Sequence, residues 1–198
     1  MVIRRATDAD LRNLCTTAMR AFHDDPVMRW LYPDDDEYFA PDGRVFVGSM
    51  TNWLTHRQPW CTDDAAAVAV WFPPTEPGAP EPDWIDAGAP LTEDLLARFE
   101  LIAPVMQEHK PDEPHWYLQL LATHPDWQRQ GLGARLMQVV FDTADADGVP
   151  CYLETERIEL VAYYRHFGFE VRSEWDVDPD ATLGQVGPHM WGMYRPTP

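Results

Sequence analysis

The sequence predicts a single α+β domain, in which a mixed, mostly antiparallel sheet of about six to seven strands is flanked by about four to five helices. Short apolar runs rich in β-branched residues alternate with segments whose apolar residues recur at helical spacing. The 198 residues, 45% of them hydrophobic, suffice for one sizeable core. The one marked change in composition is a proline-rich surface loop at about 73–90, too short to link two domains. The predicted domain therefore spans residues 1–198.

The first half of the chain is expected to supply two helices and three short strands. Residues 2–5 are extended, and residues 7–10 carry the hydroxyl and carboxylate of a helix start. The helix that follows ends at residues 24–26, where two aspartates precede a proline. A second helix is expected from about residue 38. Residues 60–72 are expected to form two strands, of which the second is small, apolar and β-branched, as central strands are.

The second half of the chain is expected to alternate helices with strands. Thr92 is a suitable cap for the first of these helices, and Gly168 is typical of the left-handed residue that ends a helix. The expected helices are 91–109, 131–147 and 158–167, and the expected strands are 116–122, 151–155, 170–177 and 190–194.

The formal net charge of -18 argues against a nucleic-acid backbone or an anionic membrane as partner. It suits a cationic substrate, and it equally suits solubility or a salty cytoplasm. The three cysteines show no C-x-x-C spacing, so we expect reduced thiols and no metal. No stretch of about 18 apolar residues occurs and the N-terminus lacks the apolar core of a signal peptide, so a cytoplasmic location is expected.

Residues 128–133 read QRQGLG, between an apolar extended stretch and a segment with helical apolar spacing. The first N–H groups of a helix have no partner within it, and glycines let a ligand approach them closely. Arg129 adds positive charge, and Gln128 and Gln130 can donate hydrogen bonds. A P-loop lysine is missing, and Leu136 stands where a dinucleotide-binding motif needs its third glycine. The turn therefore predicts either a site for another phosphate-like ligand or a tight turn with no ligand.

The wider pattern resembles the GNAT superfamily of acyl-CoA-dependent N-acetyltransferases. Gln128, Gly131 and Gly133 match its glycine motif, and Tyr164 with Gly168-Phe169 matches its downstream motif in the expected order and separation. The resemblance covers most of the chain. Within the superfamily, residues 153–169 and the tryptophan near the C-terminus are similar to the puromycin N-acetyltransferase-related group.

This resemblance implies acetyl-CoA as a co-substrate, with no metal. It implies that two parallel strands splay apart to form the cofactor cleft, and that pantetheine pairs with the backbone of Leu121, Ala122 and Thr123. Arg157 stands where many members have an asparagine that contacts the cofactor, so Arg157 is expected either to reach a phosphate instead or to make no contact with the cofactor. The residues expected to bind the pyrophosphate, through backbone amides, are Gln128, Arg129, Gln130, Gly131, Leu132, Gly133 and Ala134.

The resemblance also implies the catalytic groups. Tyr164 is the expected general acid for the departing thiolate, because it matches the tyrosine of the family motif. Gln119 occupies a strand position where many members carry a glutamate base, and an amide cannot act as a base. It is expected to position water or substrate, or to be an ordinary strand residue. The candidates for the base are Glu154 at the end of the next strand, Asp25, Glu37 and His124, and the last is favoured for a structural role.

The acceptor site in this fold is expected near residues 21–35. Asp25 would attract a cation there, and Trp30 and Tyr32 would face an apolar part of it, unless the two aromatic residues belong to the core. The predicted activity is transfer of an acetyl group to the primary amine of a small molecule by direct attack. Two alternatives stay open, an acyl-CoA-binding sensor with weak turnover and an acetyltransferase for protein or peptide amines. The expected oligomeric state is a monomer or a homodimer, and the identity of the amine is left open.

Overall fold

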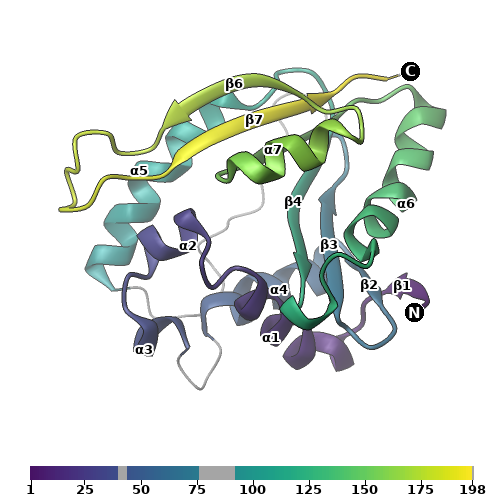
Figure 1. Cartoon of the computed structure of the whole chain (residues 1–198), viewed down its shortest axis with the longest axis horizontal. Helices are drawn as coiled ribbons and strands as arrows, with labels where there is room; N and C mark the ends of the chain where they lie inside the picture. Colours follow the sequence, from purple (N-terminus) through teal and green to yellow (C-terminus); the bar gives the residue numbers. More distant parts are fainter. Residues whose placement is uncertain (40–43, 76–91, 198) are drawn as a thin grey trace.

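The computed structural model describes residues 1–39, 44–75 and 92–197. Its centre is a seven-stranded sheet in the order β1-β2-β3-β4-β5-β7-β6 (Figure 1). The strands β4 and β5 pair in parallel, and every other neighbouring pair is antiparallel. The mixed, mostly antiparallel sheet is therefore confirmed. The strands are β1 (Ile3–Arg5), β2 (Trp60–Thr62), β3 (Ala67–Phe72), β4 (Trp116–Thr123), β5 (Cys151–Thr155), β6 (Glu170–Asp176) and β7 (His189–Arg195).

The described residues form seven α-helices, compared with the expected four to five. The additional helices are α2 and α3, which have 6 and 4 residues and begin at Asp25 and Asp34, two aspartate N-caps. The sequence pattern indicated only a turn there, because runs this short show no helical period. The helices are α1 (Leu11–Ala21), α2 (Pro26–Leu31), α3 (Asp35–Tyr38), α4 (Arg44–His56), α5 (Glu93–His109), α6 (Leu132–Asp147) and α7 (Ile158–Arg165), with 3-10 turns η1 (Asp8–Asp10) and η2 (Pro125–Trp127).

Helices cover both faces of the sheet. Because side chains alternate along a strand, Val68 and Val70 of β3 face α1 and α4, whereas Ala67 and Ala69 face α6. Figure 1 shows α6 to the right of β3 and β4, with α1 and α4 below and to their left. A third apolar cluster, around Trp30, joins α2 and α5 to the far end of β6. These layers hold the middle of the sheet rigid on both sides.

The middle of the sheet is irregular at β4. The register with β3 shifts between Val70 and Trp71, so Gln119 lies in a bulge and opposes no residue of β3. Strand β4 pairs with β5 only at Trp116–Cys151 and Tyr117–Tyr152, although both strands continue beyond these pairs. The expected separation of two parallel strands is therefore confirmed. It leaves backbone groups of β4 without a strand partner on that side.

Several local expectations are confirmed. Thr92 caps α5 and accepts a hydrogen bond from the Leu95 N–H, and Gly168 takes the left-handed conformation at φ 86°. Helix α7 ends at Arg165, two residues before the expected end. The proline-rich loop lies outside the described residues apart from residues 73–75. Within the described ranges, no helix combines the length and hydropathy that a membrane-spanning segment needs.

Candidate active site

The turn between β4 and α6 exposes the start of a long helix. Arg129 and Gly131 take left-handed backbone conformations, at φ 59° and 76°. A Cβ added to Gly131 would meet no atom within 4 Å, so the space above the turn is open. Helix α6 runs for 16 residues, and its N-cap Gly131 supplies no side-chain hydrogen bond. The first N–H groups of α6 and the helix dipole therefore face an open space, which suits an anion.

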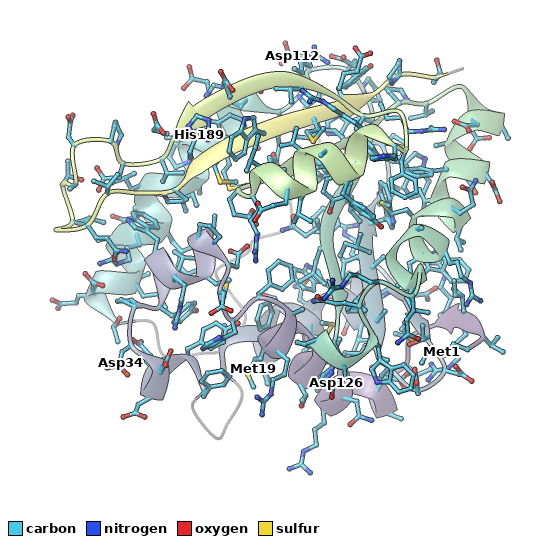
Figure 2. All side chains as sticks on the ribbon, in the orientation of Figure 1. Met1, Met19, Asp34, Asp112, Asp126 and His189 are labelled. Carbon is cyan, nitrogen blue, oxygen red and sulfur yellow. The ribbon has the colours of Figure 1, made fainter. Side chains whose placement is uncertain are left out.

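Hydrogen bonds hold this turn to the strand before it. The Gln128 side chain donates to the Thr123 carbonyl oxygen at 3.2 Å, so its amide supports the turn from within. The His124 ring accepts from the Asp126 N–H at 3.3 Å, which gives His124 a structural role. Figure 2 shows Asp126 at the lower edge of the molecule, marking where this turn lies. The turn is thus fixed before any ligand arrives.

The two glycines of the turn serve different purposes. A Cβ on Gly133 would lie 3.2 Å from the Tyr163 hydroxyl oxygen and 3.5 Å from Leu121. Gly133 therefore makes room for a side chain of α7, whereas Gly131 leaves space for something outside the chain. Close packing of Tyr163 on the first turn of α6 also brings α7 beside the turn.

The backbone of β4 is divided between two sides. The His124 N–H donates to the Ala66 carbonyl oxygen of the neighbouring strand at 2.9 Å. Because backbone groups alternate in direction along an antiparallel strand, Ala122 also points toward β3, and Leu121 and Thr123 point away from it. The latter two face the side on which β5 has separated. Of the three residues expected to pair with pantetheine, Leu121 and Thr123 therefore have backbone groups on this open side, and those of Ala122 point toward β3.

The other residues expected at the cofactor differ in how far they are exposed at the turn. Arg129 and Gln130 are exposed in the turn, and Leu132 is buried in the core below it. Ala134 is partly buried in the first turn of α6. Arg157 is the N-cap residue of α7, and its guanidinium lies 3.7 Å from the Glu159 carboxylate. These positions leave Arg129 as the cation of the turn itself.

Tyr164 lies on the inner face of α7. It is 7% exposed, and its ring packs against Tyr163 and Phe169, with centroids 5.3 and 5.9 Å away. Its hydroxyl forms no hydrogen bond with the described part of the chain. Burial raises the pKa of Tyr164, and the nearby Glu156 carboxyl raises it further. Tyr164 therefore stays protonated at neutral pH and has a proton to donate.

Gln119 and Glu154 lie on the same face of the sheet. The pairing of Tyr117 with Tyr152, continued by two residues, would place them opposite each other where β4 and β5 separate. The Gln119 Oε1 atom is buried without a hydrogen-bond partner among the described residues. The Tyr152 hydroxyl donates to the His109 carbonyl oxygen at 3.2 Å, and the Glu154 carboxyl lies close enough to raise the pKa of Tyr152. The Gln119 amide oxygen therefore has unused hydrogen-bonding capacity at this point.

A pair of carboxyl groups lies next to Tyr164. Asp25 is 4% exposed and caps α2, accepting from the Met28 N–H at 2.9 Å. Its side chain is hydrogen-bonded to Glu156, the residue that follows β5. Burial raises the pKa of Glu156 well above its usual range, and both the hydrogen bond and the charge of Asp25 raise it further. The sequence reasoning missed Glu156, although an acidic residue directly after a strand that should splay was a usable signal.

The two aromatic residues expected at the acceptor are core residues. Trp30 is 1% exposed, and its Nε1 atom lies 3.3 Å from the Gln185 carbonyl oxygen. Tyr32 is 7% exposed and packs edge-on against Tyr38 with ring centroids 6.3 Å apart. Asp25 is therefore the one member of the predicted acceptor set that meets the residues of β5 and α7. No three His, Cys, Asp or Glu side chains within the described ranges are grouped as metal ligands would be.

Comparison of the chain with protein families and known proteins finds related sequences. A family model described as "Acetyltransferase (GNAT) family" matches residues 10–169. An uncharacterized N-acetyltransferase of Schizosaccharomyces pombe is 24% identical over 190 residues, which cover 85% of this chain and 74% of the relative.

Two solved structures share the fold. A protein named histone acetyltransferase HPA2 and related acetyltransferase, from Corynebacterium glutamicum, superposes with a TM-score of 0.70 at 20% identity, covering 100% of this chain and 96% of that one. A mosquito arylalkylamine N-acetyltransferase-like protein, 5b, superposes with a TM-score of 0.63 at 19% identity, covering 98% and 99%. At these identities the likeness concerns the fold.

Proposed function

The chain belongs to the GNAT family of acetyltransferases, and on that premise we propose that it moves an acetyl group from acetyl-CoA to the primary amine of a small molecule. The observation that carries this proposal is the open start of α6 beside the unpaired side of β4. A diphosphate fits the first, since exposed N–H groups and a helix dipole favour an anion. An extended amide-bearing chain fits the second, because it can pair with strand backbone as a further strand would.

Acetyl-CoA has both of these parts. The backbone of residues 129–134 would hold its diphosphate, and Leu121 and Thr123 would pair with its pantetheine amides. When bound, acetyl-CoA supplies an acetyl thioester whose carbonyl carbon accepts the amine and whose sulfur leaves. The open space over Gly131 and the outward backbone groups of β4 are the features of this chain that fit the group.

Side chains of β4 and α7 would carry out the proton transfer and the positioning that the reaction needs. Tyr164 would hold a proton on its hydroxyl oxygen, where its raised pKa keeps it at neutral pH, and would donate that proton to the departing sulfur. Gln119, whose Oε1 atom lacks a partner among the described residues, would accept a hydrogen bond from the amine or from a water beside it. Tyr163 packs on the turn through Gly133, so we assign it a structural role.

The small-molecule acceptor is the finer part of the proposal. A carboxyl pair in which Asp25 is buried and Glu156 is half-buried suits a compact cationic amine, and so does the net charge of -18. The similarity of residues 153–169 to the puromycin N-acetyltransferase-related group points the same way without naming a compound. We propose a cytoplasmic enzyme, a monomer or a homodimer, that has neither nucleic acid nor membrane as its partner.

A second candidate function is an acyl-CoA-binding sensor with little turnover. The observation that favours it is Gln119, which cannot serve as a base where many members of the family are expected to carry a glutamate. As a sensor, the chain would bind acyl-CoA through the cofactor half of the site and would transfer little or no acetyl group.

One assay separates these functions. The protein is mixed with acetyl-CoA and a panel of primary amines, with a peptide carrying a free N-terminus as a further acceptor, and free thiol is followed over time. Thiol release that depends on a small amine supports the proposal. Binding of acetyl-CoA without release above background supports the sensor, and release with the peptide alone assigns a protein substrate. Failure to bind acetyl-CoA contradicts both candidates.

A further inference from the structure

Two carboxyl groups from distant segments of the chain are hydrogen-bonded to each other next to Tyr164. Asp25 comes from the start of α2, and Glu156 comes from the corner between β5 and α7. In Figure 1 the start of α7 lies beside α2. Ionised carboxylates only accept hydrogen bonds, so such a bond requires one proton between the two groups. The pair therefore carries one negative charge and one proton when no ligand is bound.

The positive charge of Arg157 lowers the pKa of Glu156, but it acts less strongly than burial and the Asp25 carboxyl group, which raise that pKa. The guanidinium of Arg29 bonds to Asp35 and to the Tyr32 carbonyl oxygen. The Arg157 side chain is 40% exposed and lies beside Glu159, at 3.7 Å. No arginine, lysine or histidine among the described residues forms an ion pair with either carboxyl group of the pair. A buried charge without a counter-ion costs free energy, so a cation from outside the chain would stabilise it.

Two neighbouring hydroxyl groups, those of Tyr38 and Tyr164, form no hydrogen bond with the carboxyl pair, so they do not compete with a ligand for it. The Tyr38 hydroxyl, whose pKa is raised by burial and by Asp25, donates to the Met19 carbonyl oxygen at 2.8 Å instead. Tyr164 is 7% exposed and its hydroxyl, close enough to Glu156 to sense its charge, has no hydrogen-bond partner within the described ranges. A hydroxyl on a side chain this deeply buried usually has a hydrogen-bond partner, so its lack of one is independent evidence that a polar ligand group belongs here.

We propose that Asp25 and Glu156 together bind the acceptor as its ammonium ion and remove the proton that the nitrogen must lose before it attacks. This inference rests on the proposed function, and it assigns that function a substrate class, primary amines that are cationic in solution. It also assigns the base, which the sequence left open among Glu154, Asp25, Glu37 and His124.

The protons balance over one cycle. The free pair holds one proton, and binding of the ammonium ion displaces that proton to solvent. One of the three protons on the ammonium nitrogen then moves to a carboxylate oxygen of the pair, which restores the singly protonated pair and leaves a neutral amine. The freed electron pair on nitrogen is the one that forms the new bond to carbon. The nitrogen then loses a second proton, which returns to the Tyr164 oxygen after that group has given its own proton to the departing sulfur. Because the free carboxyl pair already held one proton, taking a proton from the ammonium ion returns the pair to its starting state.

The chain supplies matched variants for the test. Asp25→Asn keeps the N-cap of α2, because asparagine caps helices as well as aspartate does, and it removes the charge. Asp34→Asn makes the same change at the N-cap of α3, where Asp34 accepts from the Asp36 and Glu37 N–H groups. Figure 2 shows Asp34 at the edge of the molecule. Glu156→Gln has a similar control in Glu159→Gln, an exposed position in the first turn of α7.

The first measurement is amine binding by calorimetry in the presence of coenzyme A, at pH 7. The probes are 2-phenylethylamine with 2-phenylethanol and butylamine with butanol, which differ in the ammonium group. We expect each amine to bind more tightly than its alcohol by about tenfold or more, since a hydrogen-bonded ion pair is worth at least ~1.4 kcal/mol in a buried site. Titration in two buffers of different ionisation enthalpy should show release of about one proton per amine bound.

The second measurement is kcat/KM for the best amine of the panel. We expect Asp25→Asn and Glu156→Gln each to lower it by about 100-fold or more, the usual contribution of a general base, with acetyl-CoA affinity unchanged within about twofold. The two control variants should stay within about twofold of wild type. Circular dichroism melts of all four variants show whether each one is folded.

Three results would overturn the assignment. They are equal binding of amines and alcohols, absence of amine binding to the wild type across the panel, and wild-type amine affinity in both Asp25→Asn and Glu156→Gln. Coenzyme A carries no acetyl group, so the calorimetry reports on the pair whether or not turnover occurs. Failure of acetyl-CoA binding or of thiol release in the wild type would instead count against the proposed function.

Discussion

The two halves of the candidate site are built from different materials. The cofactor half consists of backbone from one continuous segment, the end of β4 and the start of α6, with glycine at Gly131 where the chain turns left-handed. The acceptor half consists of side chains, Asp25, Glu156 and Tyr164, which come from three separate segments. A site made of backbone tolerates many sequences around one short motif. A site made of side chains depends on each residue, so substitutions should affect the two halves separately.

The largest expected effect lies in the acceptor half, at Tyr164→Phe. Loss of the proton donor should lower kcat by about 100-fold, while acetyl-CoA affinity stays within about twofold. Because the hydroxyl has no hydrogen-bond partner among the described residues, the variant should be as stable as wild type or slightly more so. Steady-state kinetics and thermal melts check both parts. Tyr163→Phe is the control, and equal loss of kcat in both variants would remove the distinction between the two tyrosines.

The second effect lies in the cofactor half, at Gly131→Glu. A carboxylate and a strained left-handed residue at the start of α6 should weaken acetyl-CoA binding by about 30-fold or more. Gly148→Glu is its matched control, because Gly148 also has a positive φ, 66°, and open space around it, at the other end of the same helix. Both variants should lose about 1–2 kcal/mol of stability from the strained conformation.

Calorimetry with acetyl-CoA distinguishes the two glycine variants. The prediction is a large loss of affinity in Gly131→Glu and little change in Gly148→Glu. Intact affinity in a folded Gly131→Glu variant would mean that the turn serves only the fold.

A smaller effect is expected where the two halves meet, at Gly133→Ala. The added Cβ would lie 3.2 Å from the Tyr163 hydroxyl, so α7 must shift by a few tenths of an ångström. We expect a loss of about 1 kcal/mol, within the range for overpacking a core. Tyr163→Phe in the same chain removes the crowded oxygen and should restore most of the loss. Additive destabilisation in the double variant, measured by chemical denaturation, would show that the two positions are independent.

The smallest effect concerns stability as a function of pH. The pKa of Glu156 is raised in the folded state, so the folded protein binds its proton more tightly than the unfolded chain does. Its contribution to stability is complete below its ordinary pKa, 4.5, and declines as pH rises toward the folded-state value. Glu156→Gln removes this decline, so the Tm of the variant relative to wild type should rise between pH 4 and pH 8. A constant difference would indicate that Glu156 titrates as it does in the unfolded chain.

The sequence predicted the backbone-made half better than the side-chain half. The strand, the glycine turn and the helix at 116–147 are local, and each has its own residue signal, so their order and type could be read directly. Gln128 and Gly133 show the limit of that reading. Their predicted roles at the cofactor stay predictions, and the structure adds a second role to each: the amide holds the turn to Thr123 and the glycine makes room for Tyr163. Such roles depend on distances across the fold.

The acceptor half could be predicted only in part. Asp25 was a candidate from its place in an acidic loop, but its partner Glu156 lies far along the chain, and no periodic pattern joins the two. Trp30 and Tyr32 carry the same residue types as an aromatic binding surface, and burial in the core distinguishes the two cases. Helices as short as α2 gain their stability from packing and caps, so their presence also becomes evident only in the folded chain.

The division into two independent halves is tested most directly by one crossed calorimetric measurement. Acetyl-CoA and the best amine of the panel, the latter in the presence of coenzyme A, are titrated into the folded variants Gly131→Glu and Asp25→Asn. The account predicts that Gly131→Glu loses affinity for acetyl-CoA while Asp25→Asn keeps it, and that Asp25→Asn loses affinity for the amine. Loss of acetyl-CoA affinity in Asp25→Asn, or wild-type affinity for both ligands in either variant, would contradict it.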